Sequence, residues 1–196
     1  MKTSKQTLLV LGSFLTIFLS VQTVSSQNYK VNKNESSVKI EGTSNIHDWE
    51  MVAEDFKGNL NAEMKDGQLV DISTLNFTVV AESLKSGKGG MDKNTYKALK
   101  TDKNKSITYQ LDKVKNIDCT SNSDCVVSTS GYLTIAGTKK PIDITFNAEV
   151  SGNKITLTGN QDIDMTKFNV EPPTAMFGTI TTGEDLKINF QTTFSK

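Results

Sequence analysis

Apolar and polar side chains alternate at every second position through most of the chain after residue 37, the pattern of β-strands with one buried face. The clearest example runs from Ile142 to Val150. The alternating segments are residues 38–42, 49–51, 56–64, 70–72, 75–81, 107–111, 133–135, 142–150, 155–157 and 186–194. They predict an all-β protein of about eight antiparallel strands. Long strands joined by hairpins in sequence order favour an up-and-down barrel over a sandwich.

The alternation changes phase at two places, and each change predicts an irregularity within a strand. Between Ala53 and Asp55 the apolar parity reverses, which indicates a β-bulge and a bend. A second slip falls at Ser73, after a segment in which Val70 shares the apolar face with Ile72. Two turns are also predicted, a two-residue hairpin at residues 66–67 (Asp-Gly) and a turn at residues 151–153 (Ser-Gly-Asn).

A short helix is predicted over residues 91–100, after a pair of glycines. At 100° per residue, one face carries Met91, Thr95, Ala98 and Leu99, and the opposite face carries Lys93, Lys97 and Lys100. The helix is expected to close one end of the barrel with its apolar side. Its lysines lie in a segment, residues 85–105, with seven lysines and two aspartates. They are either a solvated face or a surface that guides the mouth to an anionic membrane.

A second irregular stretch, residues 168–178, contains two consecutive prolines and therefore cannot lie in a central strand. It also carries Phe168, Met176 and Phe177. We expect a loop that packs down over apolar surface as a second element of the barrel rim.

The N-terminal segment has the three parts of a secretory signal peptide. Lys2 and Lys5 precede an apolar run from Leu8 to Leu19, and small residues at 24–26 place the cleavage before Gln27. Residues 1–26 are therefore predicted to be a signal peptide and residues 27–196 one barrel domain. The product is expected to be periplasmic or secreted, and soluble after cleavage.

The charge of the chain argues against nucleic-acid binding. The 22 basic residues are all lysines and are balanced by 22 acidic residues. Because cleavage before Gln27 would remove two lysines, the remaining charge is about −2, which gives no basic field for nucleic acid.

Cys119 and Cys125 are the only cysteines and flank five polar residues. In an exported protein this spacing indicates a disulfide that closes a hairpin tip. A metal site is the alternative, but two thiols and one distant histidine are too few ligands.

The inventory of catalytic side chains is small. His47 is the single histidine, and the chain lacks the motifs G-x-S-x-G and H-E-x-x-H. His47 is expected to be a structural residue near a barrel end, with a polar contact to a ligand headgroup as the alternative. Asp162 and Asp164 are expected to lie on a solvated outer face of a strand; the alternative is a role in acid–base chemistry or calcium binding. No enzymatic activity, cofactor or metal is predicted.

Several segments together resemble the YceI-like family of exported polyisoprenoid-binding proteins. The most specific match is residues 131–142 (GYLTIAGTKKPI), similar to the family's central hairpin. The other matching segments are residues 42–49, 91–93, 98–100, 106–109, 164–168 and 178–190. Where the family commonly has Arg and a Phe-Gly pair, this chain has Thr-Lys-Phe-Asn at 166–169.

The resemblance implies an eight-stranded, lipocalin-like antiparallel barrel with an apolar internal cavity and a short helix at its mouth. Relatives hold isoprenoid chains or similar amphiphiles there, and some are dimers, which leaves a homodimer open for this chain. The leading hypothesis is therefore a carrier of an isoprenoid or fatty-acyl amphiphile. The alternatives are a barrel filled by its own side chains that acts as a stress-related interaction module, and an enzyme that uses His47.

The ligand-binding residues follow from the alternation and the two rim elements. The tail is predicted to lie among Ile40, Trp49, Phe77, Val79, Leu133, Ile144, Phe146, Ile188 and Phe190. The predicted lid residues are Met91, Tyr96, Leu99, Phe168, Met176 and Phe177. His47 and nearby lysines are predicted to face the headgroup.

Overall fold

The computed structural model describes residues 24–196. Residues 1–23 of the predicted signal peptide lie outside this part of the chain. The strands are β1 (Ser25–Val31), β2 (Ser37–Ser44), β3 (Trp49–Ala53), β4 (Phe56–Lys65), β5 (Gln68–Val80), β6 (Leu84–Lys85), β7 (Ser106–Cys119), β8 (Asp124–Ile135), β9 (Thr138–Ser151), β10 (Lys154–Asp164), β11 (Thr174–Ala175) and β12 (Ile180–Ser195). The helices are α1 (Gly89–Leu99) and the 3-10 turns η1 (Lys33–Glu35), η2 (Ala81–Ser83), η3 (Met165–Phe168) and η4 (Met176–Gly178).

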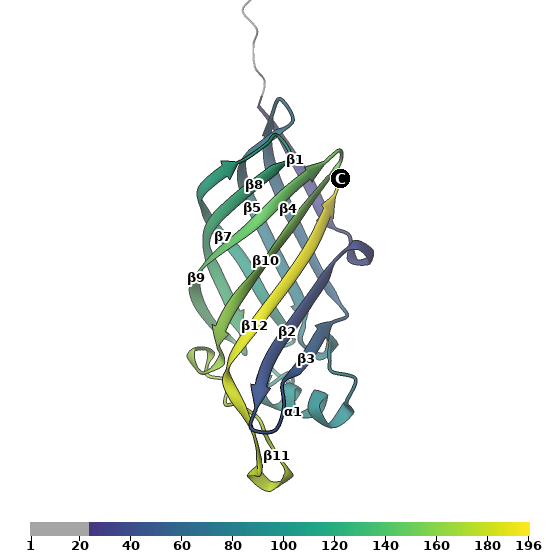
Figure 1. Ribbon diagram of the computed structural model, residues 1–196, viewed down its shortest axis with the longest axis vertical. Coiled ribbons are helices and arrows are strands. Elements are labelled where there is room, and N and C mark those ends of the chain that lie inside the picture. Colours follow the sequence, from purple (N-terminus) through teal and green to yellow (C-terminus); the bar gives the residue numbers. More distant parts are fainter. Residues whose placement is uncertain (1–23) are drawn as a thin grey trace, which may run out of the picture.

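The strands form the predicted eight-stranded antiparallel barrel (Figure 1). Its ring runs β1-β4-β5-β7-β8-β9-β10-β12, and β12 closes it by pairing with β1. Three further strands extend the sheet beyond β12: β2 pairs with β12, β3 pairs with β2, and β6 pairs with β3. In the chain, β2 follows β1, β3 precedes β4, and β6 follows β5. Every sequence-adjacent pair in the ring is therefore a hairpin or an interrupted hairpin, as expected for an up-and-down barrel.

The phase change near Ala53 is confirmed. The chain leaves β3 at Ala53 and re-enters strand at Phe56, and both of these side chains are buried. Two residues between them thus shift the inward parity by one. The slip at Ser73 is confirmed as well, since Ala62 pairs with Ile72 directly after Asn61 pairs with Thr74.

The predicted orientation of Val70 is wrong. A second register shift in the β4–β5 hairpin pairs Met64 with Leu69, so Leu69 enters the core and Val70 is 40% exposed. Leu69 and Val70 are adjacent and both apolar, so alternation alone does not show which of them faces the core.

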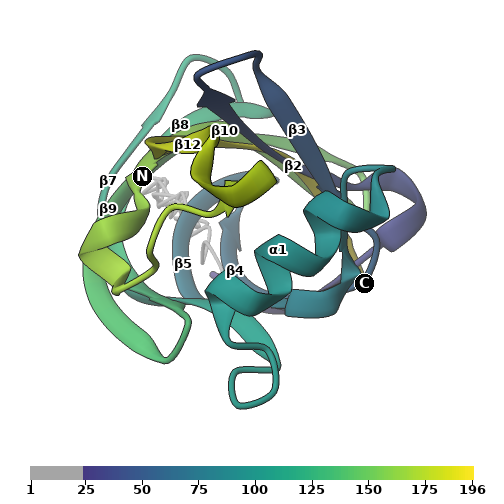
Figure 2. The same ribbon diagram turned by 90° about the horizontal axis from the view of Figure 1, so that it is seen from below.

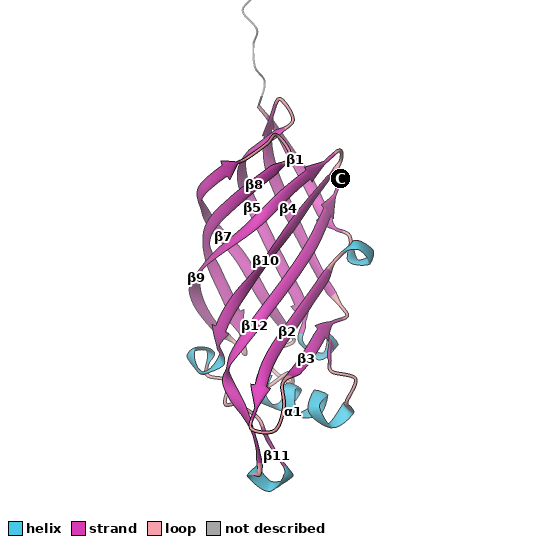
Figure 3. Ribbon diagram, in the orientation of Figure 1, coloured by secondary structure: helices cyan, strands magenta, loops and turns pink. Residues whose placement is uncertain are grey.

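The predicted two-residue hairpin at Asp66 and Gly67 joins β4 to β5. Both residues have positive φ, 52° and 82°, the conformation of a type I′ turn. The β9–β10 turn lies beside the C-terminus, where the Lys196 amide donates to the Asn153 carbonyl at 3.3 Å. The C-terminus is at one end of the barrel with this turn and the β4–β5 turn, and α1 lies at the opposite end (Figures 1 and 3). We call these ends the closed end and the mouth.

The closed half of the barrel is filled by a cluster of buried side chains. Tyr29, Leu60, Leu69, Ile155 and Phe194 are each at most 2% exposed and meet in this cluster. A packed interior of this kind stabilises the barrel without help from a ligand. The mouth half has a second buried cluster, which packs against α1 and η3.

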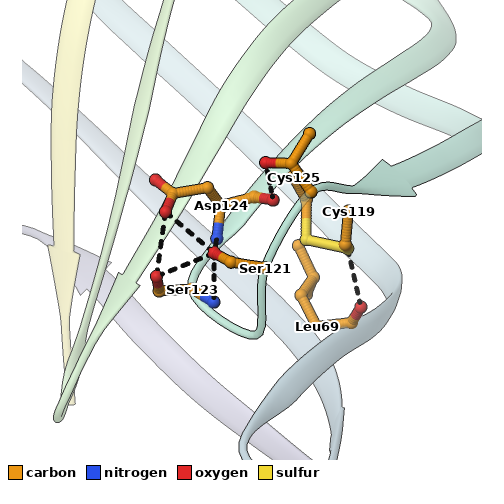
Figure 4. Close-up of a disulfide and its surroundings, with 7 residues drawn as sticks. Leu69, Cys119, Ser121, Ser123, Asp124 and Cys125 are labelled. Atoms are coloured by element: carbon orange, nitrogen blue, oxygen red, sulfur yellow. Dashed lines mark hydrogen bonds between the residues drawn. A yellow bond between two sulfur atoms is a disulfide. The ribbon is translucent and has the colours of Figure 1, made fainter.

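The predicted disulfide between Cys119 and Cys125 is confirmed and closes the β7–β8 hairpin at the closed end (Figure 4). The enclosed loop has its own hydrogen bonds: the hydroxyls of Ser121 and Ser123 donate to Asp124 Oδ2, each at 2.9 Å. The turn is thus held independently of the bridge.

Replacing both cysteines with serine is expected to lower the free energy of unfolding by only about 2 kcal/mol, because the closed loop is short. Urea unfolding followed by far-UV circular dichroism measures this change. A double variant that is unfolded without urea would show instead that the bridge holds the barrel together.

Candidate functional site

The mouth of the barrel contains a large cavity of about 1050 Å³. Most of its lining side chains are apolar, and they come from four sources. These are α1 (Met91, Thr95, Ala98, Leu99), the strand walls (Ile40, Trp49, Met51, Ile107, Ile188), the β2–β3 loop (Ile46, His47) and the 165–178 region (Met165, Val170, Met176, Phe177). Its volume lies at the upper end of the range for small-molecule sites.

A second, smaller cavity of about 150 Å³ lies deeper inside the barrel. We call it the inner chamber. It shares four wall residues with the mouth cavity: Ile40, Leu84, Ile107 and Ile188. Its other walls include Phe77, Tyr109 and Phe190, and Phe146, Leu157 and Phe194 separate it from the filled closed half.

The barrel is therefore hollow at the mouth and filled at the closed end. The expected apolar cavity is present in the mouth half, and side chains fill the closed half, as the alternative expected for the whole barrel. Because the chamber ends against buried Phe194 and Phe146, a ligand would enter from the mouth and stop at the filled half of the barrel.

Four inward-facing glycines let aromatic rings lie close to the strand backbone. Each lies beside an aromatic residue of the neighbouring strand, and the pairs are Gly42 with Trp49, Gly58 with Phe77, Gly131 with Tyr109, and Gly159 with Phe190. A Cβ on Gly58, Gly131 or Gly159 would lie 2.9, 2.7 or 2.8 Å from the ring beside it, closer than packing allows. The aromatic rings thus pack directly on the glycine backbone of the barrel wall. Glycine has low strand propensity, so this close packing explains its presence within the strands.

The Tyr109 hydroxyl in the chamber wall has a hydrogen-bond partner within the protein. The Thr129 hydroxyl donates to the carbonyl of Ile144 at 2.9 Å and lies 3.1 Å from the Tyr109 hydroxyl. Burial raises the pKa of Tyr109, so it stays neutral at physiological pH. No buried side-chain nitrogen or oxygen in residues 24–196 lacks a hydrogen-bond partner. Gln161 and Thr192 are the other polar side chains of the chamber wall, and the remaining lining is apolar.

Helix α1 crosses the mouth (Figure 2) and is fixed there by polar contacts at its first and last turns. Asp92 Oδ1 accepts hydrogen bonds from the amide and the hydroxyl of Ser86, at 2.9 and 2.6 Å, and these bonds hold the pKa of Asp92 below its usual range. Near the other end, the Tyr96 hydroxyl lies 2.9 Å from the carbonyl oxygen of Leu84. Lys85 donates to the same hydroxyl at 2.6 Å, a bond that raises the pKa of Lys85.

The helix faces match the prediction. Met91, Thr95, Ala98 and Leu99 line the mouth cavity. Lys97 and Lys100 are exposed, and exposed Lys93 stands at the cavity edge. Within residues 24–196, no helix combines the length and apolar character needed to cross a bilayer.

His47 lies in the β2–β3 loop at the mouth, and its Nδ1 is 2.8 Å from the backbone oxygen of Asp48. The predicted structural contact with backbone is thus present. The side chain also lines the mouth cavity, so the alternative contact with a ligand headgroup is sterically open. In the described part of the chain, no group of three or more His, Cys, Asp or Glu side chains is placed to hold a metal ion.

Most predicted ligand-binding residues line one of the two cavities, although their contact with a ligand stays a prediction. In the mouth cavity are Ile40, His47, Trp49, Met91, Leu99, Met176, Phe177 and Ile188. In the inner chamber are Ile40, Phe77, Val79, Leu133, Ile144, Phe146, Ile188 and Phe190. The alternation therefore identified the inner face correctly for these strands.

The expectation that Met176 and Phe177 pack down over the barrel is wrong, and two other predicted lid residues lie away from both cavities. Tyr96 and Phe168 are not among the lining residues of either cavity, since the Tyr96 hydroxyl is bound to the backbone before α1 and Phe168 is buried beneath the rim. Met176 and Phe177 do not pack down over the barrel: they are 69% and 112% exposed. Positive φ angles of 51° and 56° at these two residues turn the loop outward.

Several lining residues carry no clear signal in the sequence. Leu84 lies in a two-residue strand too short to show alternation, Met165 begins the 3-10 turn η3, and Val170 follows it. Ile107 was assigned to a strand but not to the site, although its alternation with Tyr109 and Leu111 carried the signal.

Solved structures with the same fold include three bacterial proteins. BcnA from Burkholderia cenocepacia is 16% identical, with a TM-score of 0.62 over 83% of this chain and 98% of that one. A polyisoprenoid binding domain from Saccharophagus degradans is 12% identical, with a TM-score of 0.67 over 85% and 97%. The YCEI protein of Campylobacter jejuni is 18% identical, with a TM-score of 0.54 over 99% of both chains.

Comparison with curated proteins finds no match to this chain. The family model described as the YceI-like domain, in contrast, matches residues 29–194. These residues include at least part of every strand of the barrel ring, together with both cavities and α1. The chain therefore belongs to the YceI-like family.

Proposed function

We propose that this protein is an exported carrier that binds one amphiphile, an isoprenoid or a fatty-acyl lipid, with its tail inside the barrel. The observation that supports this most strongly is the pair of adjacent apolar cavities, which open at the mouth and end at a filled core. The Saccharophagus degradans structure is described as a polyisoprenoid binding domain, and the shared fold extends that ligand class to this chain as a proposal.

The cavity sizes favour a particular arrangement of the ligand. At roughly 30 Å³ for a group the size of water, the inner chamber holds about five methyl or methylene groups. Only the end of the tail therefore reaches the chamber, and the rest of the tail with the headgroup occupies the mouth cavity. Each buried methylene contributes about 0.8 kcal/mol, so tail burial supplies most of the affinity.

Polar side chains at the edge of the mouth cavity favour an anionic headgroup. Lys88, Lys93, Asn94 and His47 all line this cavity. The two lysines are exposed, and the structure gives them no salt bridge within residues 24–196. A phosphate or carboxylate at the outer end of the tail would meet these cations without losing contact with water.

Export is part of the proposal and rests on residues 1–26, whose sequence is typical of a signal peptide. Cleavage before Gln27 would remove the first two residues of β1 and retain its pairing with β4 from Gln27 and Ala62 onward. The disulfide is consistent with an oxidising compartment.

Trp49 is the only tryptophan and lines the mouth cavity, so its fluorescence can report binding. Titration with farnesyl phosphate or palmitate, below the concentration at which each forms micelles, is expected to give a saturable blue shift of Trp49 emission. Hexyl phosphate, with a shorter tail, is the matched control and should bind far more weakly. Emission unchanged by any of these amphiphiles would contradict the proposed function.

A further inference from the structure

The loop between β11 and β12 carries two large apolar side chains into solvent. β11 and the start of β12 form a short ladder, with Ala175 paired with Ile180, and η4 sits at its tip. This tip extends beyond α1 at the mouth end of the molecule (Figure 1). Phe177 is 112% exposed and Met176 is 69% exposed, values unusual for such residues in a water-soluble domain.

The backbone holds these side chains outward. Met176 and Phe177 have left-handed φ angles of 51° and 56°, a conformation that bulky residues rarely adopt. The turn is closed by the Thr179 amide, which donates to the Met176 carbonyl at 3.2 Å. Such a conformation persists only where surrounding contacts impose it, and here those contacts expose the apolar side chains instead of burying them.

A second mouth loop is fastened to this tip. The Asn45 side chain donates to the carbonyl of Thr179 at 2.9 Å and accepts from the amide of Thr181 at 3.0 Å. The next residue, Ile46, is 57% exposed. Ile46, Met176 and Phe177 thus form one apolar patch, which we call the mouth tip, and all three also line the mouth cavity.

Cations stand on the other side of the opening. Lys88 and Lys93 line the same cavity from the α1 side, and Lys97 and Lys100 are exposed further along the helix. Asp48 and Asp185 line a neighbouring groove, which shares Lys88 and Met91 with the mouth cavity, and Asp92 of α1 is bound to Ser86. An apolar wedge beside a cationic helix is complementary to the surface of an anionic bilayer, where acyl chains lie below a layer of negative charge.

We propose that the mouth tip inserts into the acyl region of an anionic membrane while the α1 lysines contact its headgroups. The opening of the barrel then faces the lipid directly, so an amphiphile can pass between bilayer and cavity without crossing water. This surface borders the cargo site and shares its outermost residues. Because these side chains are exposed, docking would occur whether or not the barrel holds a ligand.

The first test is cosedimentation of the mature protein with vesicles of phosphatidylcholine and phosphatidylglycerol in equal parts. The double variant Met176→Ser/Phe177→Ser is expected to bind these vesicles at least about tenfold more weakly, because it lacks the inserted apolar area. Val126→Ser, which changes another exposed apolar residue on the barrel wall, is the matched control and should bind as the unchanged protein does. Equal binding by the double variant and the control would overturn the proposal.

A second measurement locates the tip within the bilayer and does not depend on the stability of the serine variant. In Phe177→Trp made on a Trp49→Phe background, the only tryptophan lies at the mouth tip. Vesicles that contain phosphatidylglycerol and brominated acyl chains are expected to quench its emission. Phosphatidylcholine vesicles with the same brominated chains should quench it much less. Absence of quenching with the anionic vesicles would show that the tip stays outside the acyl region.

Discussion

Replacing Ile188 with tryptophan is expected to abolish tail entry into the inner chamber. Ile188 lies on the wall where the mouth cavity meets the chamber, so an indole there fills the passage. Loss of about five buried methylenes at ~0.8 kcal/mol each amounts to about 4 kcal/mol, or roughly a thousandfold weaker binding. The side chain is only half-buried and faces a cavity, so the larger residue should cost little stability.

Gln191→Trp provides the matched control for this substitution. It places the same side chain on the same strand, at an exposed position of the outer face. Isothermal titration calorimetry with palmitate is expected to show full affinity for Gln191→Trp and heat too small to fit for Ile188→Trp. If Ile188→Trp binds as tightly as its control, the tail does not enter the chamber by this route.

Phe194→Ala is expected to have two large effects at once. Phe194 is fully buried, belongs to the filled half of the barrel and also lines the inner chamber. Its truncation should lower the free energy of unfolding by about 3–5 kcal/mol, as measured by urea unfolding. Because the removed ring is part of the chamber floor, the cavity also lengthens toward the closed end. The variant should therefore prefer longer tails than the unchanged protein does.

Ile155→Ala separates these two effects. Ile155 pairs with Phe194 across β10 and β12 and is equally buried, but it is not among the residues that line the chamber. It should lose about 2–5 kcal/mol of stability and keep the original preference for tail length. Equal tail-length profiles for Phe194→Ala and the unchanged protein, measured with fatty acids of increasing length, would show that Phe194 does not limit the ligand.

The barrel itself was predictable because its determinants are local. A period of two along each strand identifies the inward face, and the turn at residues 66–67 sets the register of its hairpin. The helix was equally predictable, because the apolar side chains of α1 recur at helical spacing. Errors arose where the backbone departs from regular geometry. Val70 faces outward because of a second bulge, and Phe177 is exposed because of a left-handed turn.

The shape of the interior was not predictable from alternation. Alternation shows that Phe77, Phe146 and Phe194 point inward, but their height along the axis depends on the stagger of the strands around the ring. In the structure Phe194 joins the filled half, whereas Phe77 lies against the wall over Gly58. Which part of the barrel is hollow thus depends on contacts between residues of neighbouring strands that are far apart in the sequence.

The central claim, that the barrel carries an amphiphile, is tested most directly on the protein produced and exported by its own host. Native mass spectrometry of the mature protein, followed by organic extraction, measures both the occupancy and the identity of any bound molecule. We expect a one-to-one adduct that extracts as an isoprenoid or fatty-acyl lipid with an anionic headgroup. An unliganded mass that stays unchanged after incubation with a panel of such lipids would contradict the claim and favour an interaction module.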